Sequence, residues 1–322
     1  MGANPMLLTF GRFNGSMDSA LAPFALPLPL GLGCSRLGSV LGPDERTASA
    51  LIKTALDLGM SFFDAASIYG QGDSERILGR VLGNRRDCIV CSKVGQRLPV
   101  PNPALMPVKR LARILAGRSH TIRRAVSNAR AQPMPRNWCP QYLADAVDGS
   151  LRRLGRDQVD IMLLHGPPVE VLVEGEAIDA LEAARRVGKV GIIGVSADDA
   201  ASAQAALADE RVRVLQIPLR PGETEFEGLI GTAVQKGVLV VAREVLGGPL
   251  AISGQVPAKR FAASRFAELC ERKDMAGTLV GTTKESHLRA AADQLFGSHV
   301  RVDPEPARPD VAEARELSLR LA

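Results

Sequence analysis

Short apolar runs alternate with longer amphipathic segments along most of the chain. Segments such as Glu45–Leu58 and Gly175–Val187 carry apolar residues at helical spacing. The short runs are rich in Val, Ile and Leu, which is typical of strands that are covered on both faces and pair in parallel through helical crossovers. The predicted strands are Leu30–Gly33, Ser61–Asp64, Cys88–Lys93, Val159–His165, Gly191–Ser196, Val212–Ile217, Val238–Arg243 and Gly277–Gly281.

This alternation predicts an α/β fold in which eight strand–helix units close into a (β/α)8 TIM barrel. A doubly wound open sheet is the alternative, but such sheets more often have fewer strands. Length alone would also allow two domains, whereas a barrel of this size forms one. We therefore expect residues 1–322 to form a single barrel domain with its active site at the C-terminal mouth.

Three segments lie outside the strand–helix alternation. Residues 1–29 precede the first strand, and we expect them to cap the barrel. Residues 95–140 follow the third strand and are far longer than the usual connection of about two to six residues, which predicts a long loop over the mouth. Within that loop, Val108–Ala116 is predicted to be a short basic helix. Residues 302–322 contain prolines and then a helical pattern, which predicts a linker followed by a surface helix.

The composition is that of a globular protein. The chain has 46% hydrophobic and 23% charged residues, which excludes wholesale disorder. Its five cysteines lack regular spacing and do not predict a disulfide framework. Cys88 and Cys91 lie three apart in a predicted strand, so their side chains point to opposite faces and predict no metal site. The chain has neither a signal-peptide pattern nor an apolar run of about 18 residues, so we expect a cytoplasmic protein without a membrane partner.

Positive charge is concentrated in the long loop. The net charge is only +5, yet no acidic residue lies between Asp87 and Asp145, where many lysines and arginines fall. Three interpretations remain open: a solvated lid, an anion-attracting rim for a charged substrate, or a contact with nucleic acid or membrane. The loop lacks the interleaved aromatic residues that stack on single-stranded bases, so we expect no nucleic-acid partner.

Chemically active side chains end three of the predicted strands. Asp64, Lys93 and His165 occupy these ends, which meet at the barrel mouth, and Tyr69 follows Asp64 by five residues. Burial of Asp64 and Lys93 is costly unless the two pair. A phenol with a pKa near 10 donates poorly at neutral pH unless an ammonium favours the phenolate, so Lys93 is predicted to tune Tyr69 as a general acid. A neutral His165 would hydrogen-bond the carbonyl oxygen of the substrate. The alternative is four unrelated side chains that backbone groups or water satisfy.

A set of motifs resembles the aldo-keto reductase family in order and spacing, from about residue 30 to 296. The matching segments are Phe63-Asp64-Ala-Ala-Ser-Ile-Tyr69-Gly70, Ser74-Glu75, Leu78-Gly79, Ser92-Lys93-Val94-Gly95, Ser150-Leu151-Arg152-Arg153-Leu154, Asp160-Ile-Met-Leu-Leu-His165, Gly188-Lys189-Val190, Gly194-Val195-Ser196 and Gln216. The resemblance implies a (β/α)8 barrel and hydride transfer between a nicotinamide cofactor and a carbonyl or alcohol. It also implies that Tyr69 is the proton donor, that Lys93 and Asp64 tune it, and that His165 orients the substrate.

The same resemblance implies a cofactor site. Ser196 and Gln216 would hold the nicotinamide carboxamide. The backbone of residues 243–248, at the end of the seventh strand, would line the pyrophosphate, and residues 281–284, after the eighth strand, would meet the adenosine 2'-phosphate. A lysine in that last segment favours NADPH, with NADH as the alternative. Ala197, Ala290 and Ala291 depart from the family pattern. The implied cofactor residues are Ser196, Gln216, Arg243, Leu246, Gly248, Gly281, Thr283 and Lys284.

Two functions of different classes follow. The first is an NAD(P)H-dependent oxidoreductase that acts on a small aldehyde, ketone or sugar lactol. Residues 95–140 look similar to the loop of the family branch that acts on sugars and lactols, which favours a hydroxylated substrate. The alternative is a nucleotide-binding regulatory or sensor barrel without turnover. Retention of Tyr69 together with Lys93 argues against the alternative, because a pure binding site does not need a tuned phenol.

Overall fold

The computed structural model describes residues 30–97, 134–247 and 258–296, together with the single residues Leu115, Ser119, Thr121 and Arg124. Several predicted features lie outside these residues. They are the N-terminal cap over 1–29, nearly all of the basic helix Val108–Ala116, Gly248, and the linker and helix over 302–322.

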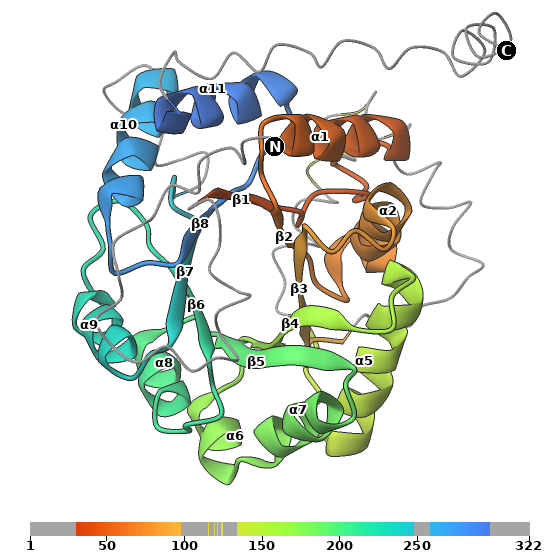
Figure 1. Ribbon diagram of the computed structural model, residues 1–322, viewed down its shortest axis with the longest axis vertical. Helices are drawn as coiled ribbons and strands as arrows, with labels where there is room; N and C mark the ends of the chain where they lie inside the picture. The colour runs from red at the N-terminus through yellow and green to blue at the C-terminus, as the bar shows by residue number, and fades with distance from the viewer. Residues whose placement is uncertain are drawn as a thin grey trace, which may run out of the picture.

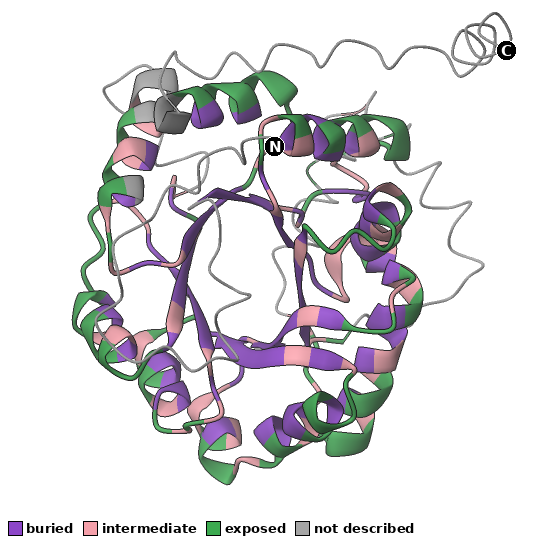
Figure 2. Cartoon of the chain, in the orientation of Figure 1, coloured by how far each residue is buried: buried purple, intermediate pink, exposed green. Residues whose placement is uncertain are grey.

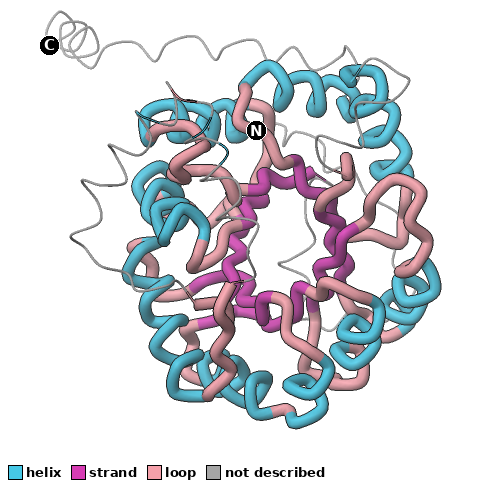
Figure 3. Tube along the Cα trace, turned by 180° about the vertical axis from the view of Figure 1, so that it is seen from behind, coloured by secondary structure: helices cyan, strands magenta, loops and turns pink. Residues whose placement is uncertain are grey.

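Eight parallel strands form a closed barrel in which each strand pairs with its neighbours in sequence and β1 pairs with β8 (Figures 1 and 3). Closure removes both sheet edges and gathers the carboxyl ends of all the strands at one mouth. The predicted (β/α)8 fold is therefore confirmed. The strands are β1 (Leu30–Gly33), β2 (Phe62–Asp64), β3 (Ile89–Val94), β4 (Val159–His165), β5 (Val190–Ser196), β6 (Val214–Pro218), β7 (Leu239–Arg243) and β8 (Gly277–Val280).

Helices surround the barrel on the outside (Figure 1). Their polar faces are exposed and their apolar faces pack on the strands (Figure 2). The elements are α1 (Glu45–Asp57), the 3-10 turn η2 (Tyr69–Gly72), α2 (Asp73–Leu82), α5 (Pro140–Leu154), α6 (Val169–Glu174), α7 (Glu176–Arg186), α8 (Ala200–Ala206), α9 (Glu227–Gln235), α10 (Ala258–Glu271) and α11 (Glu285–Phe296).

The predicted element bounds differ from the structure by only a residue or two. β1 and β4 have the predicted ends, whereas β3 runs from Ile89 to Val94, one residue later than predicted. The helical segment predicted from Gly175 begins at Glu176, because Gly175 has a φ of +79° and separates α6 from α7. Hydrophobic period identifies an element but not the residue at which its hydrogen bonding stops.

Apolar side chains form two separate clusters. One lies inside the barrel and includes Phe62, Cys91 and Leu163, and the other lies between the strands and the helices and includes Cys88. Cys88 and Cys91 therefore pack in different clusters, although Cys88 lies just before β3 rather than on it. Both packed layers hold the strands rigid, so the side chains at the strand ends are held at defined positions.

The ends of the long loop after β3 are joined at the mouth. An isolated antiparallel bridge pairs Gln96 with Arg136, and the Asn137 N–H donates to the Gly95 carbonyl over 2.8 Å. Gly95 has a φ of +106°, and a Cβ at this position would overlap the Trp138 ring. Glycine is therefore required where the chain leaves β3 beneath the indole.

Within the described ranges, no helix has both the length and the apolar character needed to cross a bilayer.

Candidate active site

Asp64 and Lys93 form a buried ion pair at the mouth. Asp64 ends β2, and the Lys93 Nζ lies 2.6 Å from each of its carboxylate oxygens and 3.0 Å from the Ala65 carbonyl. The Lys93 and Asp64 side chains are only 1% and 6% exposed. Burial alone would lower the pKa of Lys93, but attraction to Asp64 outweighs it and the pKa is raised. The predicted pairing is present, and it favours the charged form of Lys93.

Tyr69 and His165 lie beside this pair. The Lys93 Nζ is 5.1 Å from the centroid of the Tyr69 ring. The Tyr69 and His165 rings meet edge to face, with centroids 5.7 Å apart and an interplanar angle of 87°. The Ser67 N–H donates to the Lys93 carbonyl over 3.1 Å, which ties the loop carrying Tyr69 to β3. The structure therefore brings together the four side chains that the sequence places at or near strand ends.

The pKa of Tyr69 differs from the sequence-based expectation. Burial raises the pKa of the phenol above its ordinary value, and the opposing effect of Lys93 is smaller. The sequence predicts that the ammonium favours the phenolate, but it contains no measure of desolvation, which penalises the charged form. At neutral pH Tyr69 is therefore a protonated phenol, the form that can donate a proton, and Lys93 reduces the cost of losing that proton.

His165 is held neutral. Burial lowers its pKa well below the ordinary value, and the positive charges of Lys93, Arg243 and Arg136 lower it further. Its Nδ1 atom is enclosed and has no hydrogen-bond partner among the described residues. A neutral imidazole carries one N–H donor, which can bind a carbonyl oxygen at the mouth.

Ser196 and Gln216 extend the buried polar network. They occupy paired register positions on β5 and β6, and the Ser196 hydroxyl donates to Gln216 Oε1 over 3.1 Å. Gln216 Nε2 donates in turn to Asp64 Oδ1 over 2.9 Å. This link across the barrel is absent from the sequence-based prediction. The only signal for it is that Ser196 ends one predicted strand and Gln216 lies one residue before the end of the next, which places both near the level of Asp64.

A chain of ion pairs crosses the rim of the mouth. Arg243, at the end of β7, donates to Asp198 Oδ1 over 2.6 Å and also pairs with Glu244. Asp198 lies 3.7 Å from Arg136 of the long loop, and Glu244 binds Arg220 over 2.6 Å. Sequence reasoning selects only Arg243 from this set. The other charged residues follow strand ends or lie on the long loop, so their pairing depends on the closure of the barrel.

Backbone strain accompanies the site residues. Gln71 and Glu244 are the two non-glycine residues with positive φ in the described part of the chain, with values of 62° and 56°. Gln71 follows Tyr69 closely, and Glu244 adjoins Arg243. Such conformations cost about 1–3 kcal/mol each and cluster at functional sites.

The remaining predicted cofactor residues lie after β7 and β8. Leu246 is half-buried against the core, Gly281 and Lys284 are exposed, and Thr283 is partly exposed. The enclosed Arg243 Nε lacks a partner among the described residues, as does His165 Nδ1. These two atoms lie at the mouth together with the Ser196 hydroxyl and the Gln216 amide. Because the Ser196 hydroxyl and the Gln216 amide already donate within the buried network, the Arg243 N–H is the open donor that fits an anionic dinucleotide.

Comparison with known proteins identifies one family. The model of the Aldo/keto reductase family matches residues 29–295. Aldo-keto reductase yakc [NADP(+)] from Schizosaccharomyces pombe is 26% identical over 68% of this chain and 58% of its own length. A 6-dehydroglucose reductase from Novosphingobium aromaticivorans is 27% identical over 78% of this chain and 75% of its own. A D-threo-aldose 1-dehydrogenase from Pseudomonas sp is 32% identical over 54% and 51%.

Solved structures share the fold. An aldo-keto reductase from Bacillus halodurans, solved in its holo form, superposes with a TM-score of 0.65 at 22% identity and covers 91% of this chain and 92% of its own. A glycerol dehydrogenase from Gluconobacter oxydans gives a TM-score of 0.59 at 21% identity, over 84% and 86%. At these identities the superpositions bear on the fold alone.

The fold and the site define a closed (β/α)8 barrel with a buried lysine–aspartate pair, a tyrosine and a histidine gathered at its mouth. The chain belongs to the aldo/keto reductase family. The chain matches 58% of the length of the S. pombe relative and 51% of that of the Pseudomonas relative.

Proposed function

We propose that the protein catalyses reversible, NADPH-linked reduction of a small hydroxylated carbonyl compound, with Tyr69 as the general acid and base. The observation that carries this proposal is the contact of Tyr69 with both a buried Lys93–Asp64 pair and a neutral His165. A pure binding site needs no buried ammonium beside a phenol, because the burial is costly and contributes nothing to affinity.

Each side chain has one task in this mechanism. A bound nicotinamide supplies the hydride in reduction and accepts it in oxidation. Tyr69 donates its phenolic proton to the carbonyl oxygen of the substrate, and Lys93 stabilises the resulting phenolate. Asp64 holds the lysine in place and keeps it charged. His165 donates a hydrogen bond to the same substrate oxygen, and in oxidation the phenolate takes the proton back.

Tyr69→Phe tests the role of the phenol, and Tyr142→Phe is a matched control. Tyr142 is the second of two tyrosines in the chain, and its hydroxyl donates to the Gln96 carbonyl over 3.3 Å, away from Lys93. We expect Tyr69→Phe to lower kcat by about 10²–10⁴-fold, because the proton donor is lost. Fluorescence titration should show unchanged NADPH affinity. Normal turnover by Tyr69→Phe would exclude the mechanism, and cofactor binding by a wild-type protein without turnover on any carbonyl would favour a sensor.

Cofactor preference follows from Lys284. Its ammonium is exposed after β8, where it can meet the 2'-phosphate that distinguishes NADPH from NADH. The NADP(+) in the name of the S. pombe relative supports the same choice. We expect Lys284→Ala to weaken NADPH binding and to leave NADH binding unchanged. An equal loss for both cofactors would exclude 2'-phosphate recognition by this residue.

The substrate class rests on the relatives and on the mouth. Two of the relatives are named for action on sugar derivatives. In this chain, the rim of the mouth is charged and polar, which suits hydroxyl groups better than hydrocarbon. We expect higher kcat/KM for aldoses and their lactols than for apolar aldehydes of similar size. The opposite ranking would reject a hydroxylated substrate while leaving the role of Tyr69 intact.

A further inference from the structure

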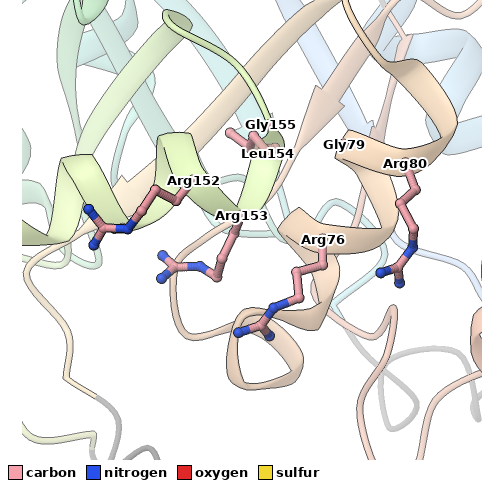
Figure 4. Close-up of a pocket in the computed structure, with 8 residues that line it drawn as sticks. Arg76, Gly79, Arg80, Arg152, Arg153, Leu154 and Gly155 are labelled. Carbon is pink, nitrogen blue, oxygen red and sulfur yellow. The ribbon is translucent and has the colours of Figure 1, made fainter.

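An open hollow of about 560 Å3 lies on the outside of the barrel, between α2 and α5. Figure 4 shows four arginine side chains that project from these two helices toward the same side. Arg76 and Arg80 come from α2, and Arg152 and Arg153 come from the last turn of α5. No acidic residue is among those that line it. We call this feature the α2–α5 arginine hollow.

Close helix packing brings the two pairs of arginines together. Gly79 of α2 lies against the Leu154 carbonyl, and a Cβ at Gly79 would overlap that backbone. On α5, Gly149 lies next to the Arg153 guanidinium, which would be in tight contact with a Cβ there. The absence of a side chain at Gly79 lets the two helices approach until arginines from each line one hollow.

The carboxylates around the hollow compensate the arginines only in part. Three of the four arginines have one carboxylate each: Arg76 pairs with Asp73, Arg80 with Glu45 and Arg153 with Glu75, over 2.9, 2.7 and 2.6 Å. Each guanidinium has five N–H donors, so one carboxylate leaves several of them open.

Arg152 is exposed and has no ion pair or hydrogen bond within the described ranges of the chain. It also borders a second hollow of about 480 Å3, which Asp148 and Asp157 line. Arg152 therefore lies at the border of the two hollows and adds a positive charge that no described carboxylate pairs with.

We propose that the α2–α5 arginine hollow binds a small phosphate-bearing anion. Planar guanidinium groups match phosphate oxygens in bidentate geometry, and several in one place neutralise more than one negative charge. An anion also relieves the repulsion between Arg76 and Arg80, which are one helical turn apart.

This site is separate from the proposed cofactor site. The last turn of α5 leads into the amino-terminal end of β4, whereas Tyr69, Lys93 and His165 lie at the carboxyl ends of the strands. The proposal therefore does not depend on the proposed function. It predicts a second anion site that remains open when a dinucleotide fills the mouth.

The choice of variants follows from the burial of Glu75. Glu75 is fully buried, and Arg153 is its partner, so removing Arg153 would leave a buried charge unpaired and threaten the fold. Arg80 and Arg152 have no such role, because Arg80 pairs only with the exposed Glu45. The double variant R80A/R152A is therefore the test, and Arg186→Ala is the control. Arg186 is another exposed helical arginine, on α7, and pairs with Glu182.

Calorimetric titration with pyrophosphate tests the proposal, with the protein alone and with the protein saturated with NADPH. We expect the wild type and Arg186→Ala to bind pyrophosphate in both conditions, and R80A/R152A to bind it about tenfold or more weakly. Circular dichroism melting without the anion verifies that each variant is folded.

Three outcomes would overturn the proposal. One is equal affinity for the wild type and R80A/R152A, and another is binding that NADPH abolishes, since that would locate the anion at the mouth. The third is preference for an acidic peptide. If oligoglutamate binds more tightly than pyrophosphate and needs the same arginines, the hollow is a protein-docking surface.

Discussion

Asp64 and Glu75 are both buried carboxylates with one basic partner, but the partners differ in exposure. Lys93, the partner of Asp64, is 1% exposed, whereas Arg153, the partner of Glu75, is 22% exposed. Lys93 Nζ is further bound by the Ala65 carbonyl and lies near the Tyr69 ring. Arg153 reaches from the surface, and its guanidinium also donates to the Ser150 hydroxyl.

This difference separates a site that controls a proton from one that holds helices and strands together. An enclosed lysine acts on its neighbours through a low-dielectric medium, so its charge changes the energy of ionising Tyr69. A partly solvated arginine stabilises Glu75 while keeping N–H groups free for the α2–α5 arginine hollow. Glu75 also accepts from the Ser92 hydroxyl over 2.5 Å, so this second network ends one residue away from Lys93 on β3.

The largest stability effect is expected from Lys93→Met. The change leaves Asp64 buried with only the Gln216 amide to offset its charge, and an unpaired buried charge costs about 3–5 kcal/mol. Urea unfolding should show this loss in the free energy of unfolding. The double variant with Asp64→Asn should recover much of it. A loss below about 1 kcal/mol for Lys93→Met would mean that the folded state tolerates the buried Asp64 charge without Lys93.

A smaller effect is expected from Glu75→Gln. The amide keeps the shape of the side chain but weakens the hydrogen bonds with Ser92 and Arg153, which costs about 1–3 kcal/mol. Arg153 is exposed enough to be solvated when its partner is neutral. Urea unfolding of Glu75→Gln and Lys93→Met under the same conditions compares their losses in the free energy of unfolding. Equal losses for the two variants would mean that the exposure of the basic partner does not set the stability lost when the pair is broken.

The pH dependence of stability gives the smallest effect. His165 has a folded-state pKa well below that of the unfolded chain, so the unfolded state binds more protons once the pH falls below about 6.5. Stability is therefore complete above that pH and declines below it, by at most about 1.4 kcal/mol per pH unit from this group.

Melting curves of the wild type and His165→Gln between pH 7 and pH 5 measure this contribution. We expect a shallower decline in the variant, because glutamine does not titrate. Parallel curves for the two proteins would mean that His165 is not held neutral by the fold.

Sequence reasoning predicts the barrel and much of the proposed site for a physical reason. Strand and helix periods are local properties, and parallel strands bring their carboxyl ends to one mouth. Asp64, Lys93 and His165 could therefore be grouped without coordinates. Arg220 and Asp198 could not, because their ion pairs depend on which rim side chains face each other after the barrel closes.

The sequence alone determined the order of the elements, the faces that they bury and the set of side chains at the strand ends. Tertiary structure alone decided that burial raises the pKa of Tyr69, that Gln216 binds Asp64, and that α2 and α5 place four arginines around one hollow. Desolvation and hydrogen bonding depend on distances of a few ångströms between segments far apart in the chain. Packing sets those distances, and local pattern does not contain them.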